Sequence, residues 1–231
     1  FSNGSGSNSL GIDLGADGPP PNNGCDVNSG TNMLQNYPVL LSAKGGSQTT
    51  IQGSLNSTAN RTFLLQFYAN ATCDTSTYGE GRTFLGDAMV TTDGSCNTNF
   101  TVVLTNIVPT GSVLTATATD SNNNTSEFSP CVALISPPII VSQPSSRTNI
   151  AGTTATFTVQ AAGTLPLVYH WKKSGTNLVN GGNVAGATTN TLTLVKVGSG
   201  DATNYTVVIT NNADSVTSAV ASLTLNLASV D

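Results

Sequence analysis

The amino-acid sequence predicts an all-β protein with two β-sandwiches in series and an extended segment at the N-terminus. Short runs of strand composition recur between turns rich in Gly, Asn, Asp and Pro. No segment shows a helical hydrophobic period of useful length. The 231 residues suffice for two domains of ordinary size. Ser136-Pro137-Pro138 supplies a stiff joint between the two sets of strands.

Residues 1–33 hold almost no periodic hydrophobic pattern, and Gly, Ser, Asn and Pro dominate them. We interpret this part as an extended segment that could add a strand to an open sheet edge of a neighbouring molecule. Asp13, Asp17 and Asp26 lie here with several Asn residues, and carboxylate and amide oxygens are ligands that Ca²⁺ takes. The spacing matches no known calcium loop, and Asp and Asn also form ordinary turns. Both interpretations stay open, and the sequence predicts no other cofactor.

Residues 34–136 are expected to form the first sandwich. Turn residues at 44–46, 92–95, 109–111 and 120–124 separate segments with strand composition. Seven short strands at such a spacing predict a sandwich. The expected strands lie near 37–43, 48–55, 62–69, 82–91, 98–106, 112–119 and 126–135.

Residues 137–231 are expected to form the second sandwich, which contains no cysteine. Its last strand is predicted to be long, because apolar residues occupy mostly alternate positions from Val216 to Leu227. The expected strands lie near 139–143, 147–150, 154–161, 167–173, 190–195, 203–210 and 215–226.

The second sandwich resembles bacterial extracellular immunoglobulin-like domains of the I-set kind, over most of 138–227. The resemblance rests on Tyr169-His170-Trp171-Lys172 and on Asp201-Ala202-Thr203-Asn204-Tyr205-Thr206-Val207. It implies that Trp171 packs at the centre of the core against Val159 and Val207, which stand where a disulfide would be. It also implies that Tyr205 forms a tyrosine corner and that Asp201 accepts hydrogen bonds in the turn before it.

The first sandwich resembles the immunoglobulin-like modules that follow parallel β-helix regions in large bacterial surface proteins. The supporting residues include Phe67-Tyr68-Ala69-Asn70 and Tyr78-Gly79-Glu80-Gly81-Arg82. Asn8 to Gly15 resembles the last rung of such a helix, so the N-terminal segment is a candidate β-helix remnant as well as a candidate donor strand.

Four cysteines, Cys25, Cys73, Cys96 and Cys131, lie in the first 135 residues. None forms a Cys-x-x-Cys pair, so the usual ligand spacing of a zinc site is absent. An even count in a chain of secreted composition favours two disulfides and an oxidising compartment. Three connectivities are open, and strand direction in a sandwich favours Cys25–Cys96 with Cys73–Cys131.

The composition excludes several classes of function. Charged residues make up only 8% of the chain, against roughly 25% in a typical soluble protein. The net charge of −5 and the lack of a basic run exclude a nucleic-acid partner. No apolar stretch approaches the roughly 20 residues that span a bilayer. A surface so poor in charge suits a protein that is secreted, glycosylated or packed into an assembly.

No catalytic constellation is visible in the sequence. The single His170 adjoins a core Trp on a strand, so its side chain is expected to point outward. Glu80 and Asp87 would be the only pair to consider for glycosidase chemistry, and their surroundings suggest a turn and a strand face. The sequence therefore predicts a protein that is not an enzyme.

Two functions are compatible with these observations. The first is a structural protein of the bacterial cell surface that self-associates into a filament or stalk by strand addition from the N-terminal segment. The alternative is a pair of accessory modules of a larger secreted enzyme or adhesin, which bind carbohydrate such as cell-surface glycans or act as spacers. Tyr37, Tyr78 and Tyr169 are the aromatic candidates for a glycan site. Both functions place the protein outside the cell.

Overall fold

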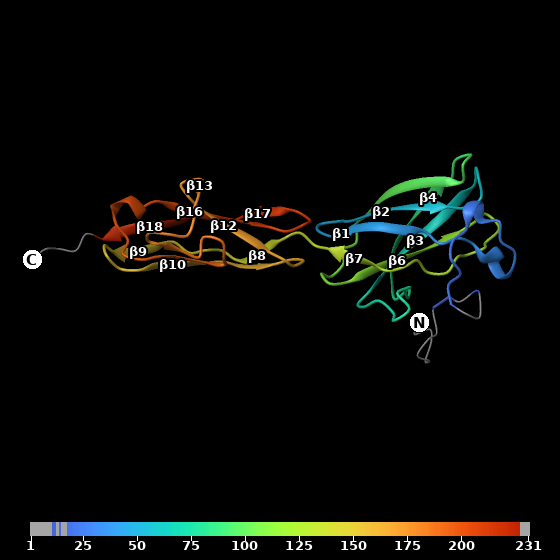
Figure 1. The fold of residues 1–231 in the computed structure, drawn as a ribbon, viewed down its shortest axis with the longest axis horizontal. Coiled ribbons are helices and arrows are strands. Elements are labelled where there is room, and N and C mark those ends of the chain that lie inside the picture. Colours follow the sequence, from blue (N-terminus) through green and yellow to red (C-terminus); the bar gives the residue numbers. More distant parts are fainter. Residues whose placement is uncertain (1–10, 13, 15–17, 227–231) are drawn as a thin grey trace, which may run out of the picture. The chain divides into compact units, whose positions relative to one another are not determined.

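The computed structural model describes residues 11, 12, 14 and 18–226. Throughout this part, regular structure consists of β-strands and three short 3₁₀ helices, η1 (Gly24–Asp26), η2 (Thr31–Leu34) and η3 (Ser199–Asp201) (Figure 1). The chain divides into two compact units, Phe1–Ile135 and Ser136–Asp231. The all-β fold class is confirmed.

Unit 1 contains seven strands in the order β4-β3-β6-β7-β1-β2-β5. The short β7 pairs antiparallel with β6 and parallel with β1, so it joins the layer β4-β3-β6 to the layer β1-β2-β5. The strands are β1 (Val39–Lys44), β2 (Thr49–Asn56), β3 (Thr62–Asn70), β4 (Thr83–Thr91), β5 (Asn97–Leu104), β6 (Val113–Thr119) and β7 (Val132–Ile135).

The core of unit 1 lies between these layers because alternate residues of β2 and β3 are apolar and point to the same side. Phe63, Leu65 and Phe67 of β3 are buried in one cluster with Ile51 of β2. The rings of Phe67 and Phe100 meet edge to face with centroids 6.0 Å apart, which links β3 to β5 of the opposite layer.

Unit 2 is a second sandwich. One layer has the order β13-β12-β16-β18-β9, with β17 beside β16, and the other contains β10-β15-β14 and the pair β11-β8. The strands are β8 (Ile139–Ser142), β9 (Arg147–Ile150), β10 (Ala155–Thr158), β11 (Gln160–Ala162), β12 (Val168–Lys173), β13 (Thr176–Asn177), β14 (Val184–Ala185), β15 (Thr191–Leu194), β16 (Asn204–Thr210), β17 (Ser215–Thr217) and β18 (Ala221–Asn226).

Trp171 lies at the centre of unit 2. It is fully buried, its Cα is paired with that of Val207 across β12 and β16, and its indole Nε1 donates to the carbonyl oxygen of Thr189 at 2.9 Å. Val159 and Val207 are buried in the same cluster. Phe157 stacks on Tyr205 with ring centroids 5.0 Å apart.

The prediction of one long strand over 215–226 is wrong, because the strand is interrupted at Ser218. The backbone N–H of Ser218 donates to the carbonyl oxygen of Val207 at 2.9 Å. The N–H of Val207 donates in return to Ser218 Oγ at 3.0 Å, and this hydroxyl donates to the carbonyl oxygen of Ala219. The hydroxyl thus takes the place of a backbone acceptor, and the ladder with β16 resumes only at β18.

The same arrangement shortens the strand expected at 126–135, of which only β7 forms. Ser126 and Ser129 donate their N–H groups to the carbonyl oxygens of Ala118 and Ala116 of β6. Their hydroxyls accept hydrogen bonds from those alanines, at 2.9 Å and 3.0 Å respectively. Residues 126–131 therefore follow β6 closely without forming a regular ladder.

Candidate functional site

Unit 1 holds both disulfides, Cys25–Cys96 and Cys73–Cys131, which is the pairing that strand direction favours. Cys25 lies in η1 and Cys96 in the turn before β5. Cys73 follows β3, and Cys131 precedes β7. The first bridge therefore ties the N-terminal segment to the sandwich, and the second ties the 71–82 loop to the segment beside β6.

Asparagine side chains also hold the described part of the N-terminal segment on its own unit. Asn22 donates to the carbonyl oxygen of Tyr37 at 2.8 Å and accepts from the Tyr37 N–H at 3.0 Å. Asn23 and Asn36 form a second reciprocal pair. Residues 18–38 contain η1 and η2 and no strand. The expected donor strand would thus have to come from residues 1–17, most of which lie outside the described part.

The aromatic candidates from the sequence do not form an open platform. The hydroxyls of Tyr37 and Tyr78 lie 3.0 Å apart and their rings meet edge to face at 5.5 Å. Burial and the Tyr78 hydroxyl raise the pKa of Tyr37. Tyr169 packs partly against the core of unit 2. These three rings serve packing within each unit.

Asp26, one of the three calcium candidates, has a carboxylate oxygen that accepts from Ser57 Oγ at 2.8 Å. Burial raises the pKa of Asp26, and the Asp120 carboxylate adds to this. Asp13 and Asp17 lie outside the described residues. Within residues 18–226 and the few described before them, no three His, Cys, Asp or Glu side chains come together in a metal-binding group.

Asp201 joins three parts of unit 2. Its carboxylate accepts from Lys173 Nζ at 2.8 Å, from Asn183 Nδ2 at 3.0 Å and from the Gly198 N–H at 3.0 Å. Burial by itself would raise the pKa of Asp201, but the bonds from Lys173 and Gly198 outweigh it and hold the pKa below its usual value. His170 is exposed on β12, opposite Val208 of β16.

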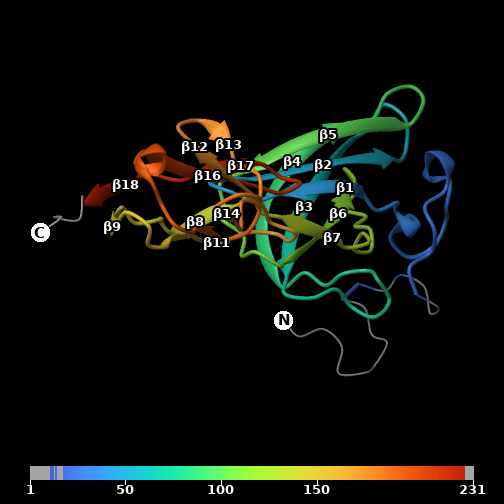
Figure 2. The same ribbon diagram turned by 60° about the vertical axis from the view of Figure 1, so that its left-hand side comes forward.

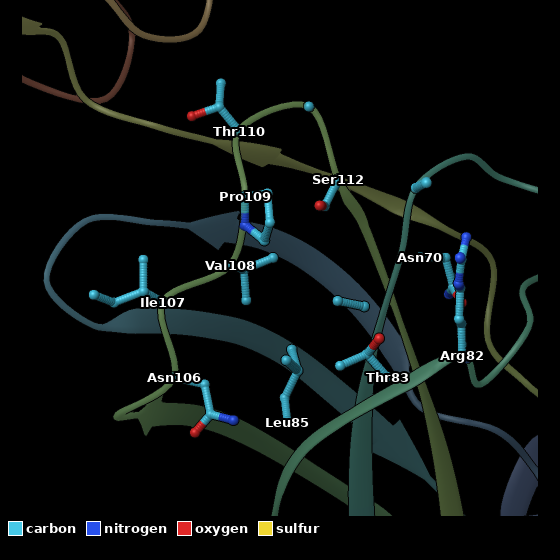
Figure 3. Close-up of a pocket in the computed structure, with 13 residues that line it drawn as sticks. Asn70, Arg82, Thr83, Leu85, Asn106, Ile107, Val108, Pro109, Thr110 and Ser112 are labelled. Atoms are coloured by element: carbon cyan, nitrogen blue, oxygen red, sulfur yellow. Dashed lines mark hydrogen bonds between the residues drawn. The ribbon is translucent and has the colours of Figure 1, made fainter.

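A groove of about 600 Å³ opens at one end of unit 1, and the sequence did not indicate it. Figure 3 shows Arg82 and Thr83, at the start of β4, on one side, and Ile107, Val108 and Pro109 on the other. Three of the lining residues are buried and apolar, namely Ala69, Leu85 and Val108. Its volume lies in the range of about 300–1,000 Å³ that is usual for small-ligand sites.

Hydrogen bonds from buried polar side chains fix both sides of the groove. Asn70, which is only 5% exposed, donates to the carbonyl oxygen of Glu80 and accepts from the Arg82 N–H at 3.0 Å. On the other side, Thr49 Oγ1 donates to the carbonyl oxygen of Asn106 at 2.8 Å. The groove is therefore largely formed before any ligand enters, which lowers the entropic cost of binding.

Three polar side chains at the rim remain available to a ligand. Within the described residues, the guanidinium of Arg82, the hydroxyl of Thr83 and the amide of Asn106 make no hydrogen bond or ion pair, and all three residues are exposed. Ile107 beside them is 75% exposed. Apolar surface with a few free donors and acceptors suits binding. The groove-lining residues include no His, Cys, Asp or Glu, so they supply no general base for a nucleophile.

One protein family and several known proteins are similar to parts of this chain. Residues 137–211 match the immunoglobulin domain family. A 92-residue part of the chain is 39% identical to Endoglucanase C of Cellulomonas fimi, which is 39% of this chain and 8% of that protein. The chain thus spans less than a tenth of that relative's length.

Among solved structures, the I-band fragment I67–I69 of titin is 15% identical, with a TM-score of 0.47 over 83% of this chain and 64% of that one. A titin M10–obscurin-like 1 complex is 26% identical, with a TM-score of 0.37 over 40% of this chain and 96% of the other. The protein is all-β, with immunoglobulin-like sandwiches in tandem, and its residues 137–211 are similar to the immunoglobulin domain family.

Proposed function

We propose that this chain forms non-catalytic accessory modules of a larger secreted bacterial protein that acts on a polysaccharide. The observation that carries the proposal is the match to Endoglucanase C, which covers 92 residues and 8% of that enzyme. A segment of that length is the size of one module, so the likeness concerns a module and leaves most of the enzyme uncovered. The two units would then place or bind the polysaccharide for a catalytic domain elsewhere.

Two features support a location outside the cell. Two disulfides tie unit 1 together, and such bonds persist in oxidising compartments. The few charges suit a secreted protein. As a separate finding that does not bear on location, none of the described helices is long and apolar enough to cross a membrane. For unit 2 we extend the proposal to an I-set arrangement, which is supported by the parallel pairing of β9 with β18.

The groove of unit 1 is the proposed glycan site. A pyranose ring has apolar C–H faces and a rim of hydroxyls, so it needs apolar surface and hydrogen-bonding groups side by side. Ile107 and Pro109 offer the apolar surface. The hydrogen-bonding groups come from Arg82, Thr83 and Asn106. Since the relative is an endoglucanase, a β-glucan is the first ligand to try.

A filament built by strand donation is less well supported. The described part of the N-terminal segment is bound to unit 1 by Cys25–Cys96 and by the asparagine pairs, and it contains no strand to donate. A pure spacer role remains the second candidate, because two sandwiches in series would serve it without any ligand.

Affinity electrophoresis in gels that contain barley β-glucan tests the proposal. We expect the β-glucan to retard the chain, and we expect the double variant Arg82→Ala/Asn106→Ala to lose at least about tenfold in affinity, which corresponds to about 1.4 kcal/mol. Arg147→Ala, which removes an exposed cation from β9 of unit 2, is the matched control and should bind normally. Equal retardation of all three proteins would refute the assignment of the groove as the glycan site. Release of reducing sugar by the chain would refute the non-catalytic role.

A further inference from the structure

The two edges of the sheet in unit 1 differ in how they are protected. β4 forms one edge and carries a bulge where Phe67 and Tyr68 face Gly86 and Phe84, and Asp87 follows the bulge. Bulges and charges are common means of preventing a sheet edge from pairing with another chain. β5 forms the other edge with eight residues, a regular register against β2, and no charge or proline.

The edges of unit 2 are shorter than β5. β13 and β14 have two residues each, β11 and β17 have three each, and β8, β9 and β10 have four each. Short edge strands offer few backbone groups to a partner. In the part of the chain that the structure describes, β5 is thus the long edge strand without a bulge, charge or proline, and Figure 2 shows it along the outer margin of unit 1.

The hydrogen bond between Ser57 N–H and the Cys96 carbonyl fixes which backbone groups of β5 face outward. Ser57 and Cys96 continue the register in which Asn56 opposes Asn97, so in antiparallel alternation the even-numbered residues of β5 bond to β2. The odd-numbered residues turn their N–H and C=O groups away from β2. The outward groups of Asn97 already have partners within the chain. Its carbonyl accepts a hydrogen bond from the Asp93 N–H, and its own N–H donates to Asp93 Oδ1.

The groups left at this edge belong to Asn99, Thr101 and Val103, and of these the Asn99 carbonyl accepts one long hydrogen bond, from Thr98 Oγ1 at 3.5 Å. All three residues are exposed, and no described strand pairs with them on this side. They are centred on Thr101. An antiparallel partner with the same sequence would therefore place Thr101 opposite its own copy and Asn99 opposite Val103, with every outward N–H facing a carbonyl.

We propose that β5 is a homotypic interaction surface, at which two copies of this chain pair antiparallel about a two-fold axis beside Thr101. The occupant is a second copy because the edge is self-complementary under that symmetry. It carries no charge that would repel its own copy. A Thr–Thr cross-strand pair at the axis is favourable. This surface is separate from the groove and independent of the proposed function.

Sedimentation velocity of the full chain over a concentration series tests this proposal. The contact is small, so we expect a weak dimer that increases with concentration. Thr101→Pro removes the central outward donor without touching the ladder to β2, as proline is tolerated on an edge strand whose N–H faces solvent. We expect this variant to dimerise at least tenfold more weakly. Met89→Lys on the protected edge β4 is the matched control and should dimerise like the wild type.

Val103→Lys gives a second test that introduces no proline, since it places a charge on an exposed position of the same edge. Far-ultraviolet circular dichroism checks that each variant is folded. Loss of the dimer in both β5 variants, with the dimer kept in Met89→Lys, is the expected result. A chain that stays monomeric at every concentration, or a dimer that both β5 variants retain, would overturn the proposal.

Discussion

The hydroxyl of Tyr205 donates a hydrogen bond to the backbone carbonyl oxygen of Asp201, at 2.9 Å. The ring of Tyr205 is fully buried, and this bond closes the turn before β16. Tyr205→Phe keeps the ring and removes the bond, and should lower the free energy of unfolding of unit 2 by about 1 kcal/mol. Urea unfolding followed by the fluorescence of Trp171, the single tryptophan, measures this. Tyr169→Phe, at a half-buried site, should change little.

The same tyrosine gives a prediction for alkaline pH. Burial, and secondarily the Asp201 charge, raise the pKa of Tyr205 from 10.0 to about 12. The folded state therefore holds this proton more tightly than the unfolded chain. Below pH 10 the group adds no pH dependence, and the stability of unit 2 should fall as pH rises from 10 to 12. Tyr205→Phe should remove this part of the fall. An unchanged alkaline profile in the variant would contradict the assignment.

Reduction of the disulfides should destabilise unit 1 alone, so that the two units unfold in separate transitions. Both bridges lie in unit 1 and close long loops, with sequence separations of 71 and 58 residues. Loss of each is expected to cost unit 1 about 2–4 kcal/mol. Unit 2 has no cysteine, so the transition seen by Trp171 fluorescence should not move in dithiothreitol, while the transition of unit 1 by circular dichroism shifts to lower temperature. A parallel shift of both signals would show that the units unfold together.

The loss of the Ser218 hydroxyl should lower the free energy of unfolding of unit 2 more than the loss of an exposed serine hydroxyl. Its hydroxyl accepts the N–H of Val207, which is buried and would have no partner in Ser218→Ala. A buried donor left without an acceptor costs about 1–3 kcal/mol. Ser215→Ala, at an exposed position of β17, is the control and should stay within about 0.5 kcal/mol of the wild type. Equal stability of the two variants in urea would mean that the hydroxyl does not replace a backbone acceptor.

Local patterns predicted much of this fold. Alternating apolar residues located the strands around Phe63 and Trp171, and the resemblance of Asp201 to Val207 to an immunoglobulin-like signature implied the buried Tyr205. The breaks at Ser126, Ser129 and Ser218 were not predicted, because a serine within an alternating pattern does not reveal that its hydroxyl bonds to a neighbouring strand. β13 and β14 have only two residues each and leave no periodic signal.

The groove could not be predicted from the sequence for a different reason. Its two sides are 20 or more residues apart in the chain and are fixed by long-range bonds, such as that from Thr49 to Asn106. Asn70 resembles any polar residue at a strand end, yet it is buried and orients Arg82. Periodicity describes one element at a time, whereas this site depends on how loops from distant parts of the chain meet.

Titration of the ¹⁵N-labelled chain with cellotetraose, followed by amide chemical shifts, tests the central claim most directly. A glycan in the groove should shift the amides of Leu85, Ile107 and Thr110, which line it, in a saturable manner. The amides around Trp171 in unit 2 should stay unchanged. Shifts confined to unit 2, or no shifts at millimolar sugar, would contradict a glycan site in unit 1.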